Sequence, residues 1–232
     1  KEGLSQEEAI NRIFLFDSHG LVTKDREGLT PLKQKFAHEL EPQSTFLDAI
    51  GEVKPTAIVG CAAQAGSFNA YVLSAMARIN ERPIIFALSN PTSRSECTAR
   101  EAYTYTEGTC LFASGSPFPQ VEVNGKTFIP RQSNNSYVFP GIGLGLVVSS
   151  PRIVPQSVFL SAAEALSKIG SEDDLENGSL FPALTKIREV SQSIAAAVAE
   201  ECFTAGVAGV PKPKDLSEAI QAAMYKPVYA QI

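Results

Sequence analysis

The apolar run that decides the fold is Pro83-Ile84-Ile85-Phe86-Ala87-Leu88-Ser89-Asn90. It is hydrophobic on both faces and ends in small polar residues, which is typical of a strand inside a parallel sheet. Three similar short runs occupy residues 12–17, 56–60 and 110–115, and helical patterns separate them. This alternation indicates an α/β fold with a parallel sheet over residues 1–115.

The pattern changes after the predicted sheet. Residues 121–129 alternate around Asn124-Gly125, which predicts a β-hairpin. From residue 140 the apolar residues follow helical spacing, and the longest stripe runs over residues 184–198. The glycines in Gly141-Ile142-Gly143-Leu144-Gly145 follow no strand, so we interpret them as small residues that let a helix pack closely. The last twenty or so residues contain three prolines and are predicted to form a surface tail.

Composition excludes several classes of protein. The 232 residues include 20 basic and 25 acidic side chains, a net charge of −5, which gives no electrostatic reason to bind nucleic acid or anionic membranes. Four cysteines without paired spacing argue against a disulfide framework or a zinc site. We therefore expect an intracellular, reducing compartment, either the cytoplasm or an organelle matrix or stroma. The two histidines, His19 and His38, lie in polar sequence and are predicted to be solvated surface residues.

Ligands of open parallel sheets bind beyond the carboxyl ends of the strands. Asp17 follows the first predicted strand, where an acid can hold a ribose hydroxyl, although a solvated turn aspartate is the equally weighted alternative. No G-x-G-x-x-G fingerprint precedes it in this sequence. The tandem asparagines Asn134 and Asn135 suit a small polar ligand or a nicotinamide, and a simple turn is the competing interpretation.

Several motifs occur together and in order. They are Ile84–Thr92 with its Ser-Asn-Pro-Thr ending, Glu96–Ala99, Thr106–Gly108, Phe112–Phe118 and Asn134–Gly141. In this combination the chain resembles the C-terminal NAD(P)-binding half of malic enzymes. The resemblance extends over nearly the whole chain. It implies an N-terminally incomplete Rossmann-like domain over residues 1–150, with C-terminal helices and a tail over 151–232 packing on it.

The resemblance also implies an activity and a set of ligands. Malic enzymes oxidatively decarboxylate (S)-malate to pyruvate and CO2 with NAD(P)+ and Mg2+ or Mn2+. By this resemblance, the substrate-binding residues are Asn90, Asn134 and Asn135. The cofactor-binding residues are Asp17, Ser18, Lys33, Gly60, Cys61, Ala62, Phe68, Ser89 and Asn90. The parent enzyme is expected to be a homo-oligomer.

The cofactor is expected to be NADP, with NAD possible. NADP-preferring members resemble this chain in the serine after the acid, Ser18, and in a lysine at the position of Lys33. A 2′-phosphate needs a cation and a small neighbour, and these two residues supply them. An ordinary surface lysine is the alternative for Lys33, at even weight.

The resemblance implies that other parts of the enzyme precede this chain. These are the first βα unit of the sheet, the acid–base tyrosine and lysine, and the metal-binding carboxylates. We therefore expect no catalytic and no metal-binding residue in this chain, weak NADP binding, and no activity of the chain alone. One departure from the family is Arg131-Gln132-Ser133, where malic enzymes usually have glycines before the paired asparagines. The alternative hypothesis is a non-catalytic binding or regulatory module that retains the fold.

Overall fold

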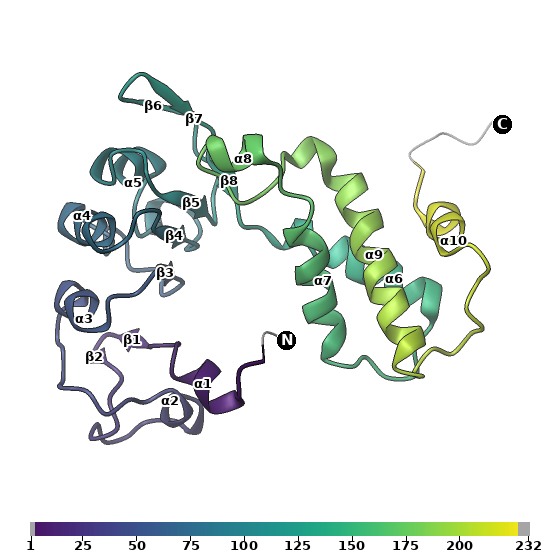
Figure 1. Ribbon diagram of the computed structural model, residues 1–232, viewed down its shortest axis with the longest axis horizontal. Coiled ribbons are helices and arrows are strands. Elements are labelled where there is room, and N and C mark those ends of the chain that lie inside the picture. Colours follow the sequence, from purple (N-terminus) through teal and green to yellow (C-terminus); the bar gives the residue numbers. More distant parts are fainter. Residues whose placement is uncertain (1–2, 227–232) are drawn as a thin grey trace. The chain divides into compact units, whose positions relative to one another are not determined.

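The computed structural model describes residues 3–226 (Figure 1). The chain divides after Pro130 into two compact units, each with its own hydrophobic core. This division differs from the boundary predicted at residue 150. The reason is that helix α6 (Phe139–Ser149) packs on helix α9 (Ile187–Thr204) and so belongs to the second unit.

A parallel sheet forms the centre of the first unit. Within residues 1–130 its strands follow the order β3 (Ala57–Gly60), β4 (Ile84–Ala87) and β5 (Leu111–Ser114). These strands match three of the four apolar runs that the sequence predicts. The α/β fold class with a parallel sheet is therefore confirmed.

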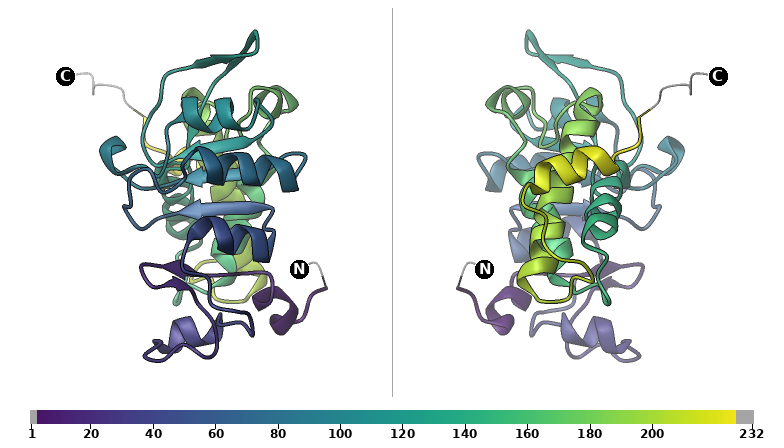
Figure 2. Two further views of the ribbon diagram at one scale, coloured as in Figure 1. Left: turned by 90° about the vertical axis from the view of Figure 1, so that its left-hand side faces the viewer. Right: turned by 90° about the vertical axis from the view of Figure 1, so that its right-hand side faces the viewer.

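Three helices lie along one face of this sheet (Figure 1; Figure 2, left). They are α3 (Phe46–Val53), α4 (Ala70–Ile79) and α5 (Ala99–Tyr105). Register aligns Ile58, Ile85 and Phe112 across the three strands. These side chains share a buried core with residues of α4 and α5, among them Val72, Met76 and Tyr103. The core therefore fixes the positions at which the strands end.

Capping boxes start two helices of the first unit. Ser5 accepts a hydrogen bond from the backbone of Glu8 at the start of α1 (Gln6–Ile10), and Glu8 accepts one back from Ser5. Thr98 and Glu101 do the same at the start of α5. Both starts are predicted by the sequence, because this spacing satisfies backbone donors that a helix terminus leaves free. The remaining short helices of this unit are α2 (Pro31–Lys35) and η1 (Thr92–Arg94).

The sequence predicts that the first strand belongs to the parallel sheet, and this prediction is wrong. It is a two-residue strand, β1 (Phe16–Asp17), and it pairs antiparallel with β2 (Gly20–Leu21) in a separate small sheet. Only two residues separate the strands, and Gly20 has a φ of +103° that turns the chain back. A Cβ there would lie 2.4 Å from the carbonyl oxygen of Gln43, so the turn requires glycine.

The predicted hairpin is confirmed. Strands β6 (Val121–Val123) and β7 (Lys126–Phe128) pair antiparallel around Asn124 and Gly125. Both turn residues have positive φ, at 52° and 74°. This is the turn type that matches the twist of a two-residue hairpin, and it is why Asn-Gly is a strong signal.

Helices α6, α7 and α9 form the second unit. Their core includes Ile142, Val158, Ala162, Val190, Ile194 and Val198. Helix α7 spans Ser157–Ser167. The other elements of this unit are β8 (Arg131–Gln132), η2 (Asn135–Tyr137), α8 (Glu172–Glu176), η3 (Leu184–Lys186) and α10 (Leu216–Ala223). The helical stripes that the sequence predicts after residue 140 thus correspond to packed helices.

The glycines of α6 let it approach α9 closely. A Cβ at Gly141 would lie 2.6 Å from the Cβ of Ile194, and one at Gly145 would lie 2.7 Å from the carbonyl oxygen of Ala195. No atom comes within 4 Å of a Cβ at Gly143. Two of the three glycines are therefore required by packing, as the sequence predicts, and the third is not.

The predicted surface tail is wrong for its described part. Residues 216–223 form α10, which packs on α6 and α9 and crosses α9 in Figure 2, right. Ile220 is 2% exposed, and Asp215 caps the helix by accepting a hydrogen bond from the backbone of Glu218 at 2.9 Å. Pro211 and Pro213 precede this helix and therefore do not interrupt it. Pro227 lies outside the described residues.

Candidate functional site

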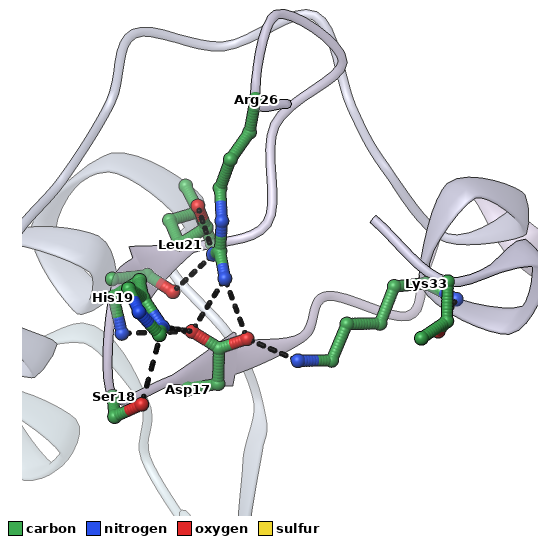
Figure 3. A network of polar contacts seen from close by, with 8 residues as sticks. Asp17, Ser18, His19, Leu21, Arg26 and Lys33 are labelled. Carbon is green, nitrogen blue, oxygen red and sulfur yellow. Dashed lines mark hydrogen bonds and ion pairs between the residues drawn. The ribbon is translucent and has the colours of Figure 1, made fainter. Parts of the chain in front are cut away.

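Asp17 is the centre of a charged cluster at the end of β1 (Figure 3). Nη2 of Arg26 donates to both carboxylate oxygens, at 2.7 and 2.6 Å, and Nζ of Lys33 donates to Oδ2. The backbone N–H of His19 donates to Oδ1 at 2.8 Å. The hydroxyl of Ser18 lies 3.2 Å from Nδ1 of His19. The structure therefore brings together three of the predicted site residues, Asp17, Ser18 and Lys33.

The cluster carries a net positive charge of about one, because two permanent cations surround one carboxylate. Desolvation acts to raise the pKa of Asp17, but the hydrogen bonds from Arg26 and Lys33 together hold it well below its usual range. The side chains of Asp17 and Arg26 are 20% and 19% exposed, whereas that of Lys33 is 38% exposed. Lys33 is thus the cation that a ligand reaches more easily.

Sequence reasoning missed Arg26. Besides its bonds to Asp17, its Nη1 donates to the carbonyl oxygens of Gly20 and Leu21, at 3.2 and 3.4 Å. These contacts fix the guanidinium against the turn. The signal that was available is an arginine within about ten residues of a strand-end acid in polar sequence, a pairing that dinucleotide folds use around a 2′-phosphate.

The loops after β3 and β4 form a second candidate region in the same unit. Gly60 ends β3, and Cys61 and Ala62 follow it as exposed residues. The hydroxyl oxygen of Ser89, after β4, accepts a hydrogen bond from the backbone N–H of Ala63 at 2.9 Å. The two strand ends are therefore tied together, as expected for the carboxyl edge of a parallel sheet.

Asn90 is oriented by the loop after β5. Its Oδ1 accepts a hydrogen bond from the hydroxyl of Ser116 at 3.2 Å, and the hydroxyl of Ser114 donates to the carbonyl oxygen of Ser116 at 2.7 Å. Because Oδ1 is the acceptor here, the side-chain NH2 is the group that Asn90 can offer to a ligand. Its predicted role in substrate binding remains a prediction.

Phe68 lies in the core of the first unit. Its side chain is 4% exposed, and its ring stacks on that of Phe46 with centroids 5.5 Å apart. This placement indicates that Phe68 packs the end of the loop after β3 into the core. Its predicted place at the dinucleotide cleft remains a prediction.

Asn134 and Asn135 belong to the second unit, and both are exposed. Oδ1 of Asn134 accepts a hydrogen bond from the backbone of Ser136 at 2.9 Å and so caps η2. This contact is what the competing turn interpretation predicts for Asn134. Binding of malate or nicotinamide by the pair remains a prediction.

The two histidines differ in their surroundings. The side chain of His19 is 79% exposed, as predicted. His38 is partly exposed, and it has contacts that a freely solvated side chain would lack: its Nε2 bonds the carbonyl oxygen of Ile13 at 2.9 Å, and its ring stacks on Phe14 with centroids 4.2 Å apart. Local sequence patterns do not indicate the contact with Ile13, because the two residues are 25 positions apart.

Within residues 3–226, no three His, Cys, Asp or Glu side chains are grouped so that they could hold a metal ion. The described part of the chain also contains no helix that is long and apolar enough to cross a membrane.

The amino-acid sequence matches a known protein family. The family model described as "Malic enzyme, NAD binding domain" matches residues 1–203. This chain belongs to that family. The resemblance that the sequence motifs indicate is therefore confirmed.

Curated malic enzymes match the chain over almost all of its length. An NAD-dependent mitochondrial malic enzyme of Ascaris suum is 47% identical over 232 residues, which are 100% of this chain and 36% of the relative. An NADP-dependent chloroplastic malic enzyme of Zea mays is 48% identical over 96% of this chain and 35% of the relative. An NADP-dependent malic enzyme of Anas platyrhynchos is 47% identical over 99% of this chain and 42% of the relative. The chain thus spans between a third and somewhat more than two-fifths of the length of these malic enzymes.

A solved malic enzyme shares the fold. The crystal structure of Entamoeba histolytica malic enzyme has a TM-score of 0.68 and 23% sequence identity to this chain, and the match covers 91% of this chain and 42% of the other. At this identity the likeness supports the Rossmann-like fold alone.

Proposed function

We propose that this chain is the dinucleotide-binding part of an NADP-dependent malic enzyme, which oxidatively decarboxylates (S)-malate to pyruvate and CO2. Membership of the family supports dinucleotide binding in general, and the named relatives include both NAD- and NADP-dependent enzymes. The choice between the two cofactors depends on the Asp17 cluster.

One observation carries the proposal of NADP: the Asp17 carboxylate is paired with both Arg26 and Lys33. A free strand-end carboxylate accepts the ribose hydroxyls of NAD and repels a 2′-phosphate. Here its charge is neutralised, and one positive charge remains for the phosphate. Ser18 is small enough to leave space beside it, and its hydroxyl can donate to a phosphate oxygen.

Arg26 and Lys33 have different parts in this proposal. The guanidinium of Arg26 donates hydrogen bonds to Asp17 and to two backbone carbonyls, so it holds the acid in place. Lys33 is more exposed and its ammonium group is carried by a flexible stem, so it is the group that turns from Asp17 to the phosphate.

The proposed reaction needs the dinucleotide as hydride acceptor. This chain is proposed to supply part of the dinucleotide site and one contact to the substrate. Asn90, held by Ser116, offers its side-chain NH2 to an oxygen of malate. The described residues offer no group of three His, Cys, Asp or Glu side chains that could hold Mg2+ or Mn2+. Since metal-assisted decarboxylation needs such ligands, the chain alone is proposed to bind NADP+ without turning malate over.

Two measurements on the purified 232-residue chain test this proposal. Calorimetric titration with NADP+ is expected to show weak but saturable binding. Absorbance at the NADPH band is expected to stay flat with NADP+, malate and Mn2+. Malate- and Mn2+-dependent NADPH formation would contradict the proposed inactivity, and no binding of either NADP+ or NAD+ would contradict the proposed dinucleotide site.

A further inference from the structure

Glu96 is a carboxylate buried where the loops after β3 and β4 meet. It is 1% exposed. A carboxylate in such a place is costly unless hydrogen-bond donors compensate for the lost water. Its partners therefore indicate why the chain keeps an acid there.

Ser89 supplies two of these donors. Its hydroxyl donates to Oε1 of Glu96, and its backbone N–H donates to Oε2 at 3.3 Å. Because the hydroxyl proton is committed to Glu96, the hydroxyl oxygen is left as an acceptor, and it accepts the N–H of Ala63 at 2.9 Å. Glu96 thus orients Ser89, and Ser89 in turn holds Ala63.

The backbone makes the same connection. The N–H of Phe68 donates to the carbonyl oxygen of Glu96 at 3.0 Å, and the N–H of Gly66 donates to that of Ser95 at 3.2 Å. Ala63 has a φ of +54°, a conformation that residues other than glycine rarely adopt. The loop over residues 61–68 is therefore held by the segment that contains Glu96 rather than by its own regular structure.

Gly60 provides the space for this carboxylate. A Cβ at Gly60 would lie 2.4 Å from both Cγ and Cδ of Glu96. The absence of a side chain at the end of β3 is thus explained by Glu96, without any ligand approaching the backbone. This assigns Gly60 a role different from the cofactor contact that the resemblance implies.

We infer that Glu96 is a positioning residue, which through Ser89 holds the 61–68 loop and the adjoining Asn90 in one fixed arrangement. The inference rests on the proposed function, because these two segments are its candidate dinucleotide and substrate contacts. Asn90 directly follows Ser89, so a shift of Ser89 moves both segments together. Neither Glu96 nor Ala63 needs to touch a ligand for this role.

Three variants of the full 232-residue chain test the inference. Glu96→Gln keeps the shape but replaces one acceptor by a donor, so it cannot accept both bonds from Ser89. Ser89→Ala removes the link to Ala63. Ile85→Val is the matched control, because it trims a fully buried side chain of β4 away from the loops.

Hydrogen–deuterium exchange of the ligand-free chain is the first readout. We expect the amide of Ala63 to exchange about tenfold faster in Glu96→Gln and Ser89→Ala, at temperatures where all variants are folded. Ile85→Val should leave it unchanged relative to neighbouring amides. Equal exchange at residue 63 in all chains would overturn the inference.

Titration with NADP+ is the second readout. If the wild-type chain binds, both loop variants should bind about three- to tenfold more weakly, and Ile85→Val should bind as the wild type does. Unchanged affinity in the loop variants would show that Glu96 has only a structural role and would overturn the inference. If the wild-type chain binds no dinucleotide, the proposed function fails, and the exchange at Ala63 still decides whether Glu96 holds the loop.

Discussion

A single nitrogen of Arg26, Nη2, bonds both carboxylate oxygens of Asp17, at 2.7 and 2.6 Å. This pairing changes what a strand-end acid can do. Arg26 fixes the Asp17 carboxylate and neutralises its negative charge. The charge of Lys33 therefore gives the cluster a net positive charge. The acid becomes a support for a cation instead of the contact for a ribose hydroxyl.

The Asp17 pairs predict a specific dependence of stability on pH. Because the pKa of Asp17 is lowered below its ordinary value of 3.8, its pairs stabilise the folded state above that pH. This contribution is lost as the pH falls below 3.8 toward the folded-state pKa. Asp17→Asn should lower the free energy of unfolding by about 1–2 kcal/mol at pH 7, and the difference from wild type should shrink below pH 4. Urea unfolding of wild type and Asp17→Asn between pH 7 and pH 3 measures this difference in the free energy of unfolding.

Asp25 provides the control for that experiment, because it is an exposed acid in the same loop. Asp25→Asn should change the free energy of unfolding by no more than about 0.5 kcal/mol at any of these pH values. A difference between wild type and Asp17→Asn that stays constant from pH 7 to pH 3 would contradict the proposed electrostatic role.

The glycines of α6 predict opposite effects for one substitution. Gly143→Ala should raise the free energy of unfolding by about 0.5–1 kcal/mol, because the position is open and alanine favours the helix. Gly145→Ala should lower it by about 1–3 kcal/mol, because its Cβ would lie 2.7 Å from the carbonyl oxygen of Ala195. Thermal and urea unfolding of the pair measure both. The close packing of α6 on α9 is refuted if the two changes have the same sign.

Helix α10 should contribute to the stability of the second unit. Ile220→Ala removes most of a side chain that is 2% exposed and should cost about 2–4 kcal/mol. Ser217→Ala, at an exposed position of the same helix, serves as control and should stay within about 0.5 kcal/mol of wild type. Urea unfolding followed by circular dichroism compares them. Equal stability of the two variants would mean that α10 does not pack as described.

Local signals predicted much of this structure. The capping boxes at Ser5 and Thr98, the Asn124-Gly125 turn and the apolar strands all depend on residues within a few positions of one another. The glycine spacing in α6 was interpretable for the same reason. These patterns needed no knowledge of distant contacts.

The errors arose where distant residues decide the structure. An apolar run that leads into Asp17 has the same appearance whether its strand joins a parallel sheet or turns back at Gly20. The prolines before α10 obscured a helix whose single buried residue, Ile220, contacts other helices. The pairing of Arg26 with Asp17 and the enclosure of Glu96 under Gly60 also depend on the folded chain.

The most direct test of the central claim is the ratio of the dissociation constants for NAD+ and NADP+. We expect the 232-residue chain to bind NADP+ about tenfold more tightly than NAD+ at low salt. Lys33→Gln should abolish this preference, whereas Lys35→Gln, an exposed lysine on the same helix α2, should keep it. Calorimetric titration of the three chains with both dinucleotides gives the ratios. Equal or tighter binding of NAD+ by the wild-type chain, or an NADP+ preference that survives in Lys33→Gln, would contradict the account.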